Sequence, residues 1–247
     1  MAADTAIAIL GTGDMGRAFG LRLAGLGYRV IYGSRAPESD GVRELVAATG
    51  HGATATHSAD AARAADVVVV ALPWQPIDAL LDELGDLPGK IVIDLTWPEN
   101  VVDDDGYDRI VADVSAAEKI QRRLAGARVV KAFGTTGSNV VLDPRVAGGT
   151  VSIPIASDHR GAKERVAGLA VELGFDPVDA GPLRMARNIE AMMELYMVPL
   201  FQGRDISWEF HFRRTDHWAR APYSGGEVGD ERPPAVDAGD LAEFPPN

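Results

Sequence analysis

Three glycines with the spacing of a dinucleotide-binding turn follow a short apolar segment near the start of the chain. They are Gly11, Gly13 and Gly16, in the pattern Gly-x-Gly-x-x-Gly, with a strand pattern before them at residues 6–10 and a helix pattern after them at 17–26. The first glycine permits the tight turn, the second lets the backbone approach a pyrophosphate, and the third allows close helix packing. The arrangement predicts dinucleotide binding, and a ligand-free strand-to-helix turn is the alternative.

The end of the next apolar segment selects between the two nicotinamide dinucleotides. Residues 28–35 have a strand pattern that ends in Gly33, Ser34 and Arg35. An acidic residue here would bind the ribose 2′-hydroxyl and repel a 2′-phosphate. A hydroxyl and a guanidinium suit a phosphate instead, so the sequence favours NADP(H) over NAD(H). A solvated arginine beside a turn is the alternative.

The elements that must position these residues alternate between strand and helix. Strands are predicted at residues 6–10, 28–35, 53–56, 66–72, 90–96, 128–133, 150–156 and 176–179, and helices at 17–26, 36–49, 60–65, 76–84, 115–124, 160–173 and 183–200. The predicted fold class is α/β, a doubly wound parallel (Rossmann) sheet with helices on both faces, a small helical C-terminal part and an acidic C-terminal arm.

Local signals refine two of these helices and one connecting segment. Pro37 suits the first turn of the second helix, and Ser115 with Glu118 forms a capping box at the start of the fifth. Residues 99–113 include three consecutive aspartates without the spacing of metal ligands, so they are predicted to form a solvated loop. Ligands of open parallel sheets bind beyond the carboxyl ends of the strands, which are predicted here at 11–15, 72–74, 96–98 and 133–138.

The chain is predicted to have three parts. Residues 1–180 form the NADP-binding Rossmann domain, 181–223 a helical part that completes the substrate pocket, and 224–247 an arm with six acidic residues and one arginine. Residues 207–214 are aromatic and basic, which favours a segment that covers the core. The alternative hypothesis is that Trp208, Phe210, His211 and Trp218 close over the substrate pocket, from the same chain or a second subunit.

Composition excludes several classes of function. The formal net charge of −12 over 247 residues argues against a nucleic-acid partner, because phosphate contacts need a basic surface. There is no cysteine, which excludes disulfides and thiolate chemistry, and no metal site is predicted. No apolar stretch has the length of a membrane span and the N-terminus lacks a signal pattern, so we expect a cytoplasmic protein with a small-molecule substrate.

Several of these segments together resemble a known family. They are residues 11–16, 33–35, 72–74, 129–133, 179–183 and 186–190, and they are similar to the NADPH-dependent coenzyme F420 reductases, also called F420-dependent NADP oxidoreductases. The resemblance covers about residues 5–214 and is shared in part by the cytosolic domain of transmembrane ferric reductases. It implies direct hydride transfer between the nicotinamide of NADP(H) and the deazaflavin ring of F420, which needs stacked rings and little acid–base help.

The resemblance also implies which residues bind each ligand. Thr12, Ser34 and Arg35 would hold the phosphates of NADP, and residues 72–74 would pass under its ribose and nicotinamide. The predicted cofactor-binding residues are Gly11, Thr12, Gly13, Asp14, Met15, Gly16, Ser34, Arg35, Leu72, Pro73, Trp74, Thr96 and Ala132. The predicted substrate-binding residues are Trp97, Phe133, Gly134, Thr135, Thr136, Gly137, Met192 and Tyr196.

The chain departs from the family pattern on the substrate side. Family members often carry asparagine where this chain has Trp97 and Gly134, and the tail beyond Arg214 is also different. One alternative is therefore an NADPH-dependent reductase of another small molecule, such as an imine, a carbonyl or a flavin-like compound, and another is a non-catalytic NADP-binding sensor.

A proton donor and an oligomeric state complete the expectations. Carbonyl or imine reduction benefits from a proton donor, for which Lys131, Tyr196 and His211 are the candidates. For Lys131 the alternative is a strand-end lysine paired with an acid. The methionine-rich helix predicted at 183–200 is more often core than a cofactor contact, and it could equally form a two-fold interface, which favours a homodimer.

Overall fold

The computed structural model describes residues 5–73, 77–97, 100–102, 108–110, 114–201 and 210–214. The chain is one compact unit as far as Arg213, and residues 214–247 form a second unit of which the structure describes only Arg214. The described residues 181–201 and 210–213 belong to the same unit as the sheet. Among the described helices, none is both long enough and apolar enough to cross a membrane.

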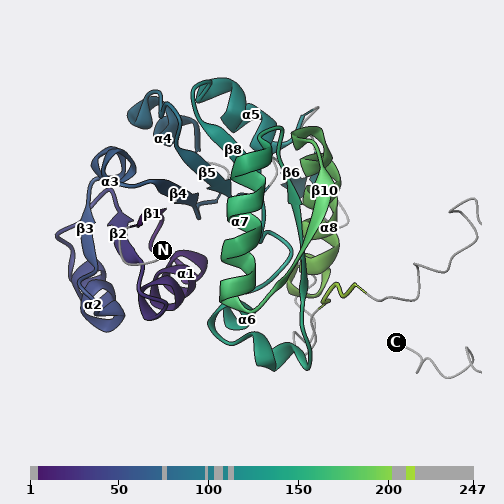
Figure 1. Ribbon diagram of the computed structural model, residues 1–247, viewed down its shortest axis with the longest axis horizontal. Coiled ribbons are helices and arrows are strands. Elements are labelled where there is room, and N and C mark those ends of the chain that lie inside the picture. Colours follow the sequence, from purple (N-terminus) through teal and green to yellow (C-terminus); the bar gives the residue numbers. More distant parts are fainter. Residues whose placement is uncertain are drawn as a thin grey trace, which may run out of the picture. The chain divides into compact units, whose positions relative to one another are not determined.

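The centre of the molecule is an eight-stranded sheet (Figure 1). Its order is β10-β9-β8-β5-β4-β1-β2-β3, with β1 next to both β2 and β4. A separate antiparallel pair, β6 and β7, lies between β5 and β8 in the chain. The strands are β1 (Ala6–Leu10), β2 (Arg29–Gly33), β3 (Thr54–Thr56), β4 (Val67–Val70), β5 (Ile91–Asp94), β6 (Asn100–Val102), β7 (Asp108–Ile110), β8 (Arg128–Lys131), β9 (Ser152–Ala156) and β10 (Asp176–Gly181).

Helices lie on both faces of this sheet, as the predicted fold class requires. They are α1 (Asp14–Gly25), α2 (Asp40–Thr49), α3 (Ser58–Ala64), α4 (Ile77–Leu84), α5 (Ala116–Arg123), α6 (Ser138–Leu142), α7 (Arg160–Leu173) and α8 (Ala186–Phe201), with 3-10 turns η1 (Pro144–Ala147) and η2 (Leu183–Met185). One face is covered by α1, α2, α6 and α7, and the other by α3, α4 and α5 with the start of α8.

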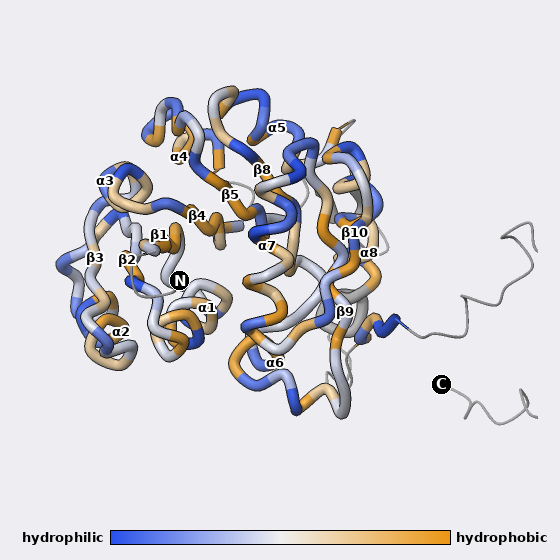
Figure 2. Tube along the Cα trace, viewed as in Figure 1, coloured by the Kyte–Doolittle hydropathy of each residue, from blue (hydrophilic) through white to orange (hydrophobic). Residues whose placement is uncertain are grey.

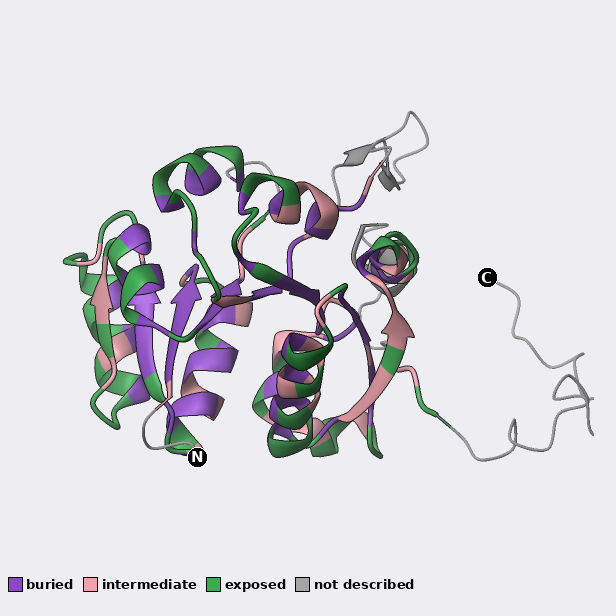
Figure 3. Cartoon of the chain, turned by 45° about the horizontal axis from the view of Figure 1, so that its top comes forward, coloured by how far each residue is buried: buried purple, intermediate pink, exposed green. Residues whose placement is uncertain are grey.

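Alternation along the strands feeds these two cores. In β1, Ile7 and Ile9 pack towards α1, whereas Ala8 and Leu10 pack towards α3. All five residues of β1 and all four of β4 are buried, which is why both segments are apolar without interruption. The central strands are accordingly buried between exposed helix surfaces (Figure 3) and are apolar along the chain (Figure 2).

The sheet is mostly parallel, as predicted, and the last two strands are where it departs from that pattern. β9 and β10 are parallel to each other, but a single antiparallel bridge between Lys131 and Ala156 joins β9 to β8. The hydroxyl of Ser157 also donates to the carbonyl of Val129, at 2.6 Å. The unit β9-α7-β10 therefore runs opposite to β8 where the two meet.

Three further local predictions differ from the structure. The predicted loop at 99–113 contains β6 and β7, and α2 begins at Asp40, so Pro37 lies before the helix. The last helix begins with a 3-10 turn, and α6 had no counterpart in the predicted elements. The capping box of α5 is confirmed, with both the Ser115 and the Glu118 contacts present.

The described end of the chain returns to the start of β9. The carbonyl of Phe212 accepts a hydrogen bond from the backbone of Ser152 at 2.6 Å, and the guanidinium of Arg213 donates to the carbonyl of Ala147. This part of the aromatic segment therefore lies along residues 147–152. Trp208 and Trp218 lie outside the described residues.

Candidate functional site

The glycine turn between β1 and α1 has one position that faces outward. Gly11 has φ +117°, and a Cβ there would collide with the carbonyl oxygen of Ala71, while a Cβ at Gly16 would collide with the carbonyl oxygen of Gly11. At Gly13, by contrast, a Cβ would meet nothing within 4 Å. Gly11 and Gly16 are thus required by the protein's own packing, and Gly13 leaves space in front of the turn for a ligand.

The helix that follows presents its N-terminus at the same place. Gly13 is the N-cap of α1, and no side chain caps the first turn. Uncapped N–H groups at a helix N-terminus attract anions. Thr12 and Met15 are half-buried, whereas Asp14 is exposed. The turn can therefore hold a phosphate with backbone groups.

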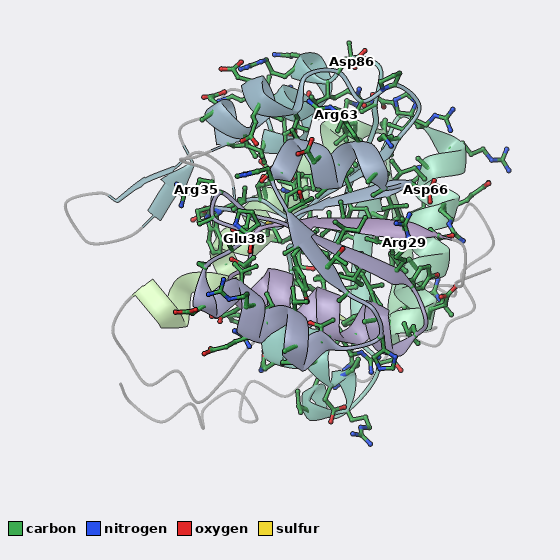
Figure 4. The ribbon with its side chains drawn as sticks, turned by 90° about the vertical axis from the view of Figure 1, so that its left-hand side faces the viewer. Arg29, Arg35, Glu38, Arg63, Asp66 and Asp86 are labelled. Carbon is green, nitrogen blue, oxygen red and sulfur yellow. The ribbon has the colours of Figure 1, made fainter. Side chains whose placement is uncertain are left out.

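Ser34 and Arg35 directly follow β2, whose last residue pairs with Leu10 at the end of β1. The Ser34 hydroxyl accepts a hydrogen bond from the backbone of Ala36 at 3.2 Å. Arg35 is exposed, and within the described residues no ion pair involves it. Figure 4 shows Arg35 beyond one end of β2 and Arg29, the first residue of that strand, at the other end. Its guanidinium is available to a ligand phosphate.

The carboxyl ends of β4 and β5 form the next part of the edge. Leu72 is half-buried and Pro73 exposed, whereas Trp74 lies outside the described residues. Thr96 is fully buried, and its hydroxyl and backbone N–H both donate to the same oxygen of Asp94, at 2.7 and 2.8 Å. In this structure the side chain of Thr96 is therefore bound to Asp94, the last residue of β5.

Lys131, at the end of β8, is enclosed by acceptors. Its Nζ lies 3.0 Å from Asp94 Oδ2, 2.6 Å from the carbonyl of Thr96 and 3.1 Å from Glu190 Oε1. Burial alone would lower the pKa of Lys131, but the carboxylates of Asp94 and Glu190 outweigh that effect and raise it. The ammonium donates two hydrogen bonds, to Asp94 and to the carbonyl of Thr96, and forms an ion pair with Glu190. The lysine therefore pairs with acids, which was the alternative to a proton donor.

The turn after β8 holds Phe133 in an uncommon backbone conformation, and its ring packs against two other aromatic rings. Phe133 has φ +61°, a region that non-glycine residues seldom adopt. Its ring is fully buried and makes edge contacts with Phe19 and Phe175, at centroid distances of 5.1 and 5.9 Å. The ring of Phe133 thus belongs to the core, and a substrate at this edge could contact only its backbone.

Gly134 lies under the last helix. A Cβ at Gly134 would collide with the sulfur of Met193, which is itself only 2% exposed. The absence of a side chain at Gly134 is therefore what admits Met193. Ala132, Thr135 and Thr136 are buried, and Gly137 is the N-cap of α6.

One face of α8 is attached to the carboxyl edge by polar contacts. Arg187 makes two hydrogen bonds to Glu118, at 2.8 and 2.9 Å, and Glu190 Oε2 accepts from the backbone of Ala116 at 3.1 Å. The indole N–H of Trp97 donates to Glu194 at 2.7 Å. The contacting positions 187, 190 and 194 recur at helical spacing, so α8 is held across the ends of β5 and β8 and the start of α5.

Sequence reasoning did not identify the residues that make this attachment. Asp94, Glu118, Arg187, Glu190 and Glu194 were not predicted as site residues, although Lys131 and Trp97 were. The available signal was an acidic residue within the otherwise apolar stripe of the last helix, opposite a lysine at a strand end. Of the other candidates, Met192 is half-buried, His211 lies beside Phe212, and the side chain of Tyr196 lies outside the described part of the structure.

Comparison with known proteins places this chain in a family. The profile of NADP oxidoreductases that are coenzyme F420-dependent matches residues 6–98. The F420-dependent NADP reductase of Methanothermobacter marburgensis is 35% identical over 203 residues, which cover 76% of this chain and 89% of that protein. The chain belongs to the family of F420-dependent NADP oxidoreductases. It is also 30% identical to the metalloreductase STEAP3 of Rattus norvegicus, of which it spans 36%.

Solved structures share the fold. A candidate F420-dependent NADP reductase from Arthrobacter is 30% identical with a TM-score of 0.75, covering 85% of this chain and all of that one. An imine reductase from Aspergillus terreus, in complex with NADPH4, is 18% identical with a TM-score of 0.59, covering 81% of this chain and 63% of that one. At that identity, the second likeness concerns the fold alone.

Proposed function

We propose that this protein transfers a hydride between NADP(H) and coenzyme F420. The observation that carries the proposal is the outward-facing Gly13 turn, together with the exposed Arg35, which pairs with no acid among the described residues, in a chain of the F420-dependent family. The turn and the start of α1 would hold the pyrophosphate, and Thr12, Ser34 and Arg35 the phosphates, including the 2′-phosphate.

Direct ring-to-ring transfer fits the chemistry available at this edge. Stacking nicotinamide against a deazaflavin requires positioning, and the protein's part is to orient the two rings. Lys131 has its three nearest acceptors inside the protein, so it is unsuited to donate a proton to a bound substrate. Leu72, Pro73, Trp74, Thr96 and Ala132 would line the nicotinamide side of the site.

The acceptor would bind where α8 meets β5 and β8. Trp97 and Gly134 both contact α8, through Glu194 and Met193 respectively. Thr135, Thr136, Gly137, Met192 and Tyr196 would border the second ring, with the backbone of Phe133. A second candidate function keeps NADPH but reduces another small molecule, such as an imine, a carbonyl or a flavin-like compound. It is favoured by Trp97 and Gly134, because both reshape the acceptor side.

One experiment separates these functions. Purified protein is mixed with NADPH and oxidised F420, and the absorbance of both chromophores is followed. Equal and rapid loss of both is the result expected for the proposed function. Loss of NADPH only with an imine or carbonyl from a test panel supports the second candidate, and NADPH binding without turnover of any acceptor contradicts both.

We also propose a homodimer. The support is the methionine-rich helix α8, which carries exposed Leu195 at 50% exposure within a segment that also covers the site. Sedimentation at micromolar concentration is expected to give a species of twice the 26.2 kDa chain mass, and a species of the single-chain mass would contradict the proposal.

A further inference from the structure

α8 contributes one buried carboxylate where it crosses the carboxyl ends of β5 and β8. Glu190 is 2% exposed, and its partners Lys131 and Asp94 are fully buried. Placing two acids and one base out of water is costly unless each group is paired. An apolar residue would have sufficed to pack α8 on the sheet, so packing alone does not explain a carboxylate at this position.

The two oxygens of Glu190 have different partners: one forms an ion pair and the other accepts a hydrogen bond. Oε1 lies 3.1 Å from the ammonium of Lys131, and Oε2 accepts from the backbone N–H of Ala116, the first residue of α5. Neither partner can act as an acceptor at these atoms. A carboxylate can face an ammonium and an N–H with one oxygen each, whereas the isosteric amide of glutamine is uncharged and would turn its NH2 towards one of the two.

Through these contacts Glu190 fixes α8 against two separate elements at once. Lys131 ends β8 and is itself bound to the carbonyl of Thr96 at the end of β5, while Ala116 begins α5. Met193 and Glu194 follow Glu190 by three and four residues, so they lie on the same face of the helix. These two residues contact Gly134 and Trp97, which are the positions assigned to the acceptor side.

We propose that Glu190 is a positioning residue for the acceptor: through its ion pair with Lys131 and its hydrogen bond from the start of α5, it sets the height of α8 above the ends of β5 and β8. The identity of the acceptor rests on the function proposed above, whereas the positioning of α8 does not. Loss of either acceptor oxygen shifts Met193 and Glu194 and with them the acceptor-facing surface, while the dinucleotide turn at Gly11–Gly16 stays in place.

The test compares the full-length protein with Glu190→Gln, and with Glu190→Asp, which retains two acceptor oxygens on a shorter side chain. Glu164→Gln is the matched control, because it removes the same charge from an exposed ion pair on α7. The readouts are the NADPH dissociation constant, kcat and KM for F420, and hydrogen exchange of peptides from α8 and from residues 115–120. Glu190→Gln is expected to raise the F420 KM about tenfold, the weight of one hydrogen bond to a charged group.

The accompanying readouts separate positioning from a general loss of structure. In Glu190→Gln, kcat at saturating F420 and the NADPH dissociation constant are expected to change less than about twofold, again on the scale of one local contact. Exchange is expected to accelerate in α8 and at the start of α5 but not in α1. Glu190→Asp is expected to show a smaller rise in KM, and it replaces the glutamine variant if that one does not fold.

Two results would overturn the proposal. One is unchanged hydrogen exchange in α8 of Glu190→Gln. The other is a fall in NADPH affinity and in kcat that accompanies the rise in KM. Absence of F420 turnover in the wild-type protein would instead reject the proposed function. In that case hydrogen exchange still decides whether Glu190 holds α8, and the KM comparison is made with the imine or carbonyl that the protein does reduce.

Discussion

Arg35 and Lys131 show how the same charge serves opposite purposes at the two sides of the site. Arg35 is exposed, follows the end of β2, and has no ion-pair partner in the described part of the chain. Lys131 is fully buried among three oxygen acceptors. An unpaired surface guanidinium can bind a ligand at little cost, whereas a saturated buried ammonium holds protein elements together.

Replacing Arg35 with alanine is expected to weaken NADPH binding without affecting NADH. A hydrogen bond to a charged group contributes about 1.5–3 kcal/mol, so the NADPH dissociation constant should rise about 10- to 150-fold. Fluorescence titration with both dinucleotides measures the effect. Arg43→Ala is the control, because Arg43 is an exposed arginine that already pairs with Asp40. An equal loss of affinity for NADPH and NADH would contradict a 2′-phosphate role.

The glycines of the turn are expected to differ in what their substitution damages. Gly13→Ala should leave the free energy of unfolding within about 1 kcal/mol, the scale of an N-cap change, because a Cβ there meets no other atom. It should nevertheless weaken NADPH binding at least about tenfold, since the methyl group occupies the approach to the pyrophosphate. Gly11→Ala should destabilise the fold by about 2 kcal/mol or more. Urea unfolding and NADPH titration of both variants check this, and equal stability losses would contradict it.

At the scale of elements, the Glu118–Arg187 pair is one of the polar contacts that join α8 to α5. Hydrogen bonds from Arg187 and from Ser115 lower the pKa of Glu118 to about 2, from an ordinary value of 4.5. Because the folded-state pKa is depressed, this carboxylate contributes stability above pH 4.5 and loses that contribution as the pH falls towards 2.

The stability difference between the wild-type protein and Glu118→Gln is therefore expected to be pH-dependent. It should be full at pH 7, start to shrink below pH 4.5 and vanish near pH 2, because protonation then removes the same charge from the wild type. Urea unfolding of both proteins at pH 7, 4 and 3 measures it. A difference that stays constant over this range would show that the pair is not coupled to folding.

Elements were predictable where the pattern was local and continuous. β1 and α7 have the predicted bounds, because β1 is wholly apolar and α7 ends at Gly174, which adopts the left-handed conformation. The pair β6 and β7 was missed, since two strands of three residues show no periodicity and pair only with each other. The reversal of β9 is a property of how distant segments meet, which no local pattern encodes.

The residues that we propose to bind NADP(H) lie close to strand ends in the sequence, whereas the contacts at the proposed acceptor side join distant parts of the chain. The glycine turn and the Ser34–Arg35 pair each lie within a few residues of one strand end. The contacts of α8 join residues 59 to 97 positions apart, such as Lys131 with Glu190 and Trp97 with Glu194. Sequence could propose Lys131 and Trp97 as residues of interest, but their partners depend on where α8 crosses the sheet.

At the scale of the whole molecule, two kinds of contact join the elements: apolar packing and paired polar groups. The sheet from β3 to β8 is a continuous parallel ladder with apolar packing on both faces. β9 joins it through one bridge, and α8 crosses its edge through hydrogen-bonded polar groups. Apolar packing tolerates small displacements, whereas paired polar groups fix a geometry, and the polar contacts lie where we propose that the acceptor binds.

Because Lys131 is enclosed beneath α8, its chemical reactivity should report how often α8 separates from the edge of the sheet. Of its four lysines, Lys90, Lys119, Lys131 and Lys163, Lys131 lies at 0% exposure. An amine-reactive acylating reagent should therefore modify Lys131 only during moments when α8 lifts from the edge, at a rate that reports the population of that opened form. Mass spectrometry of labelled peptides should show Lys163 acylated long before Lys131. Bound acceptor should slow Lys131 further, whereas equal labelling rates would mean that the edge is open most of the time.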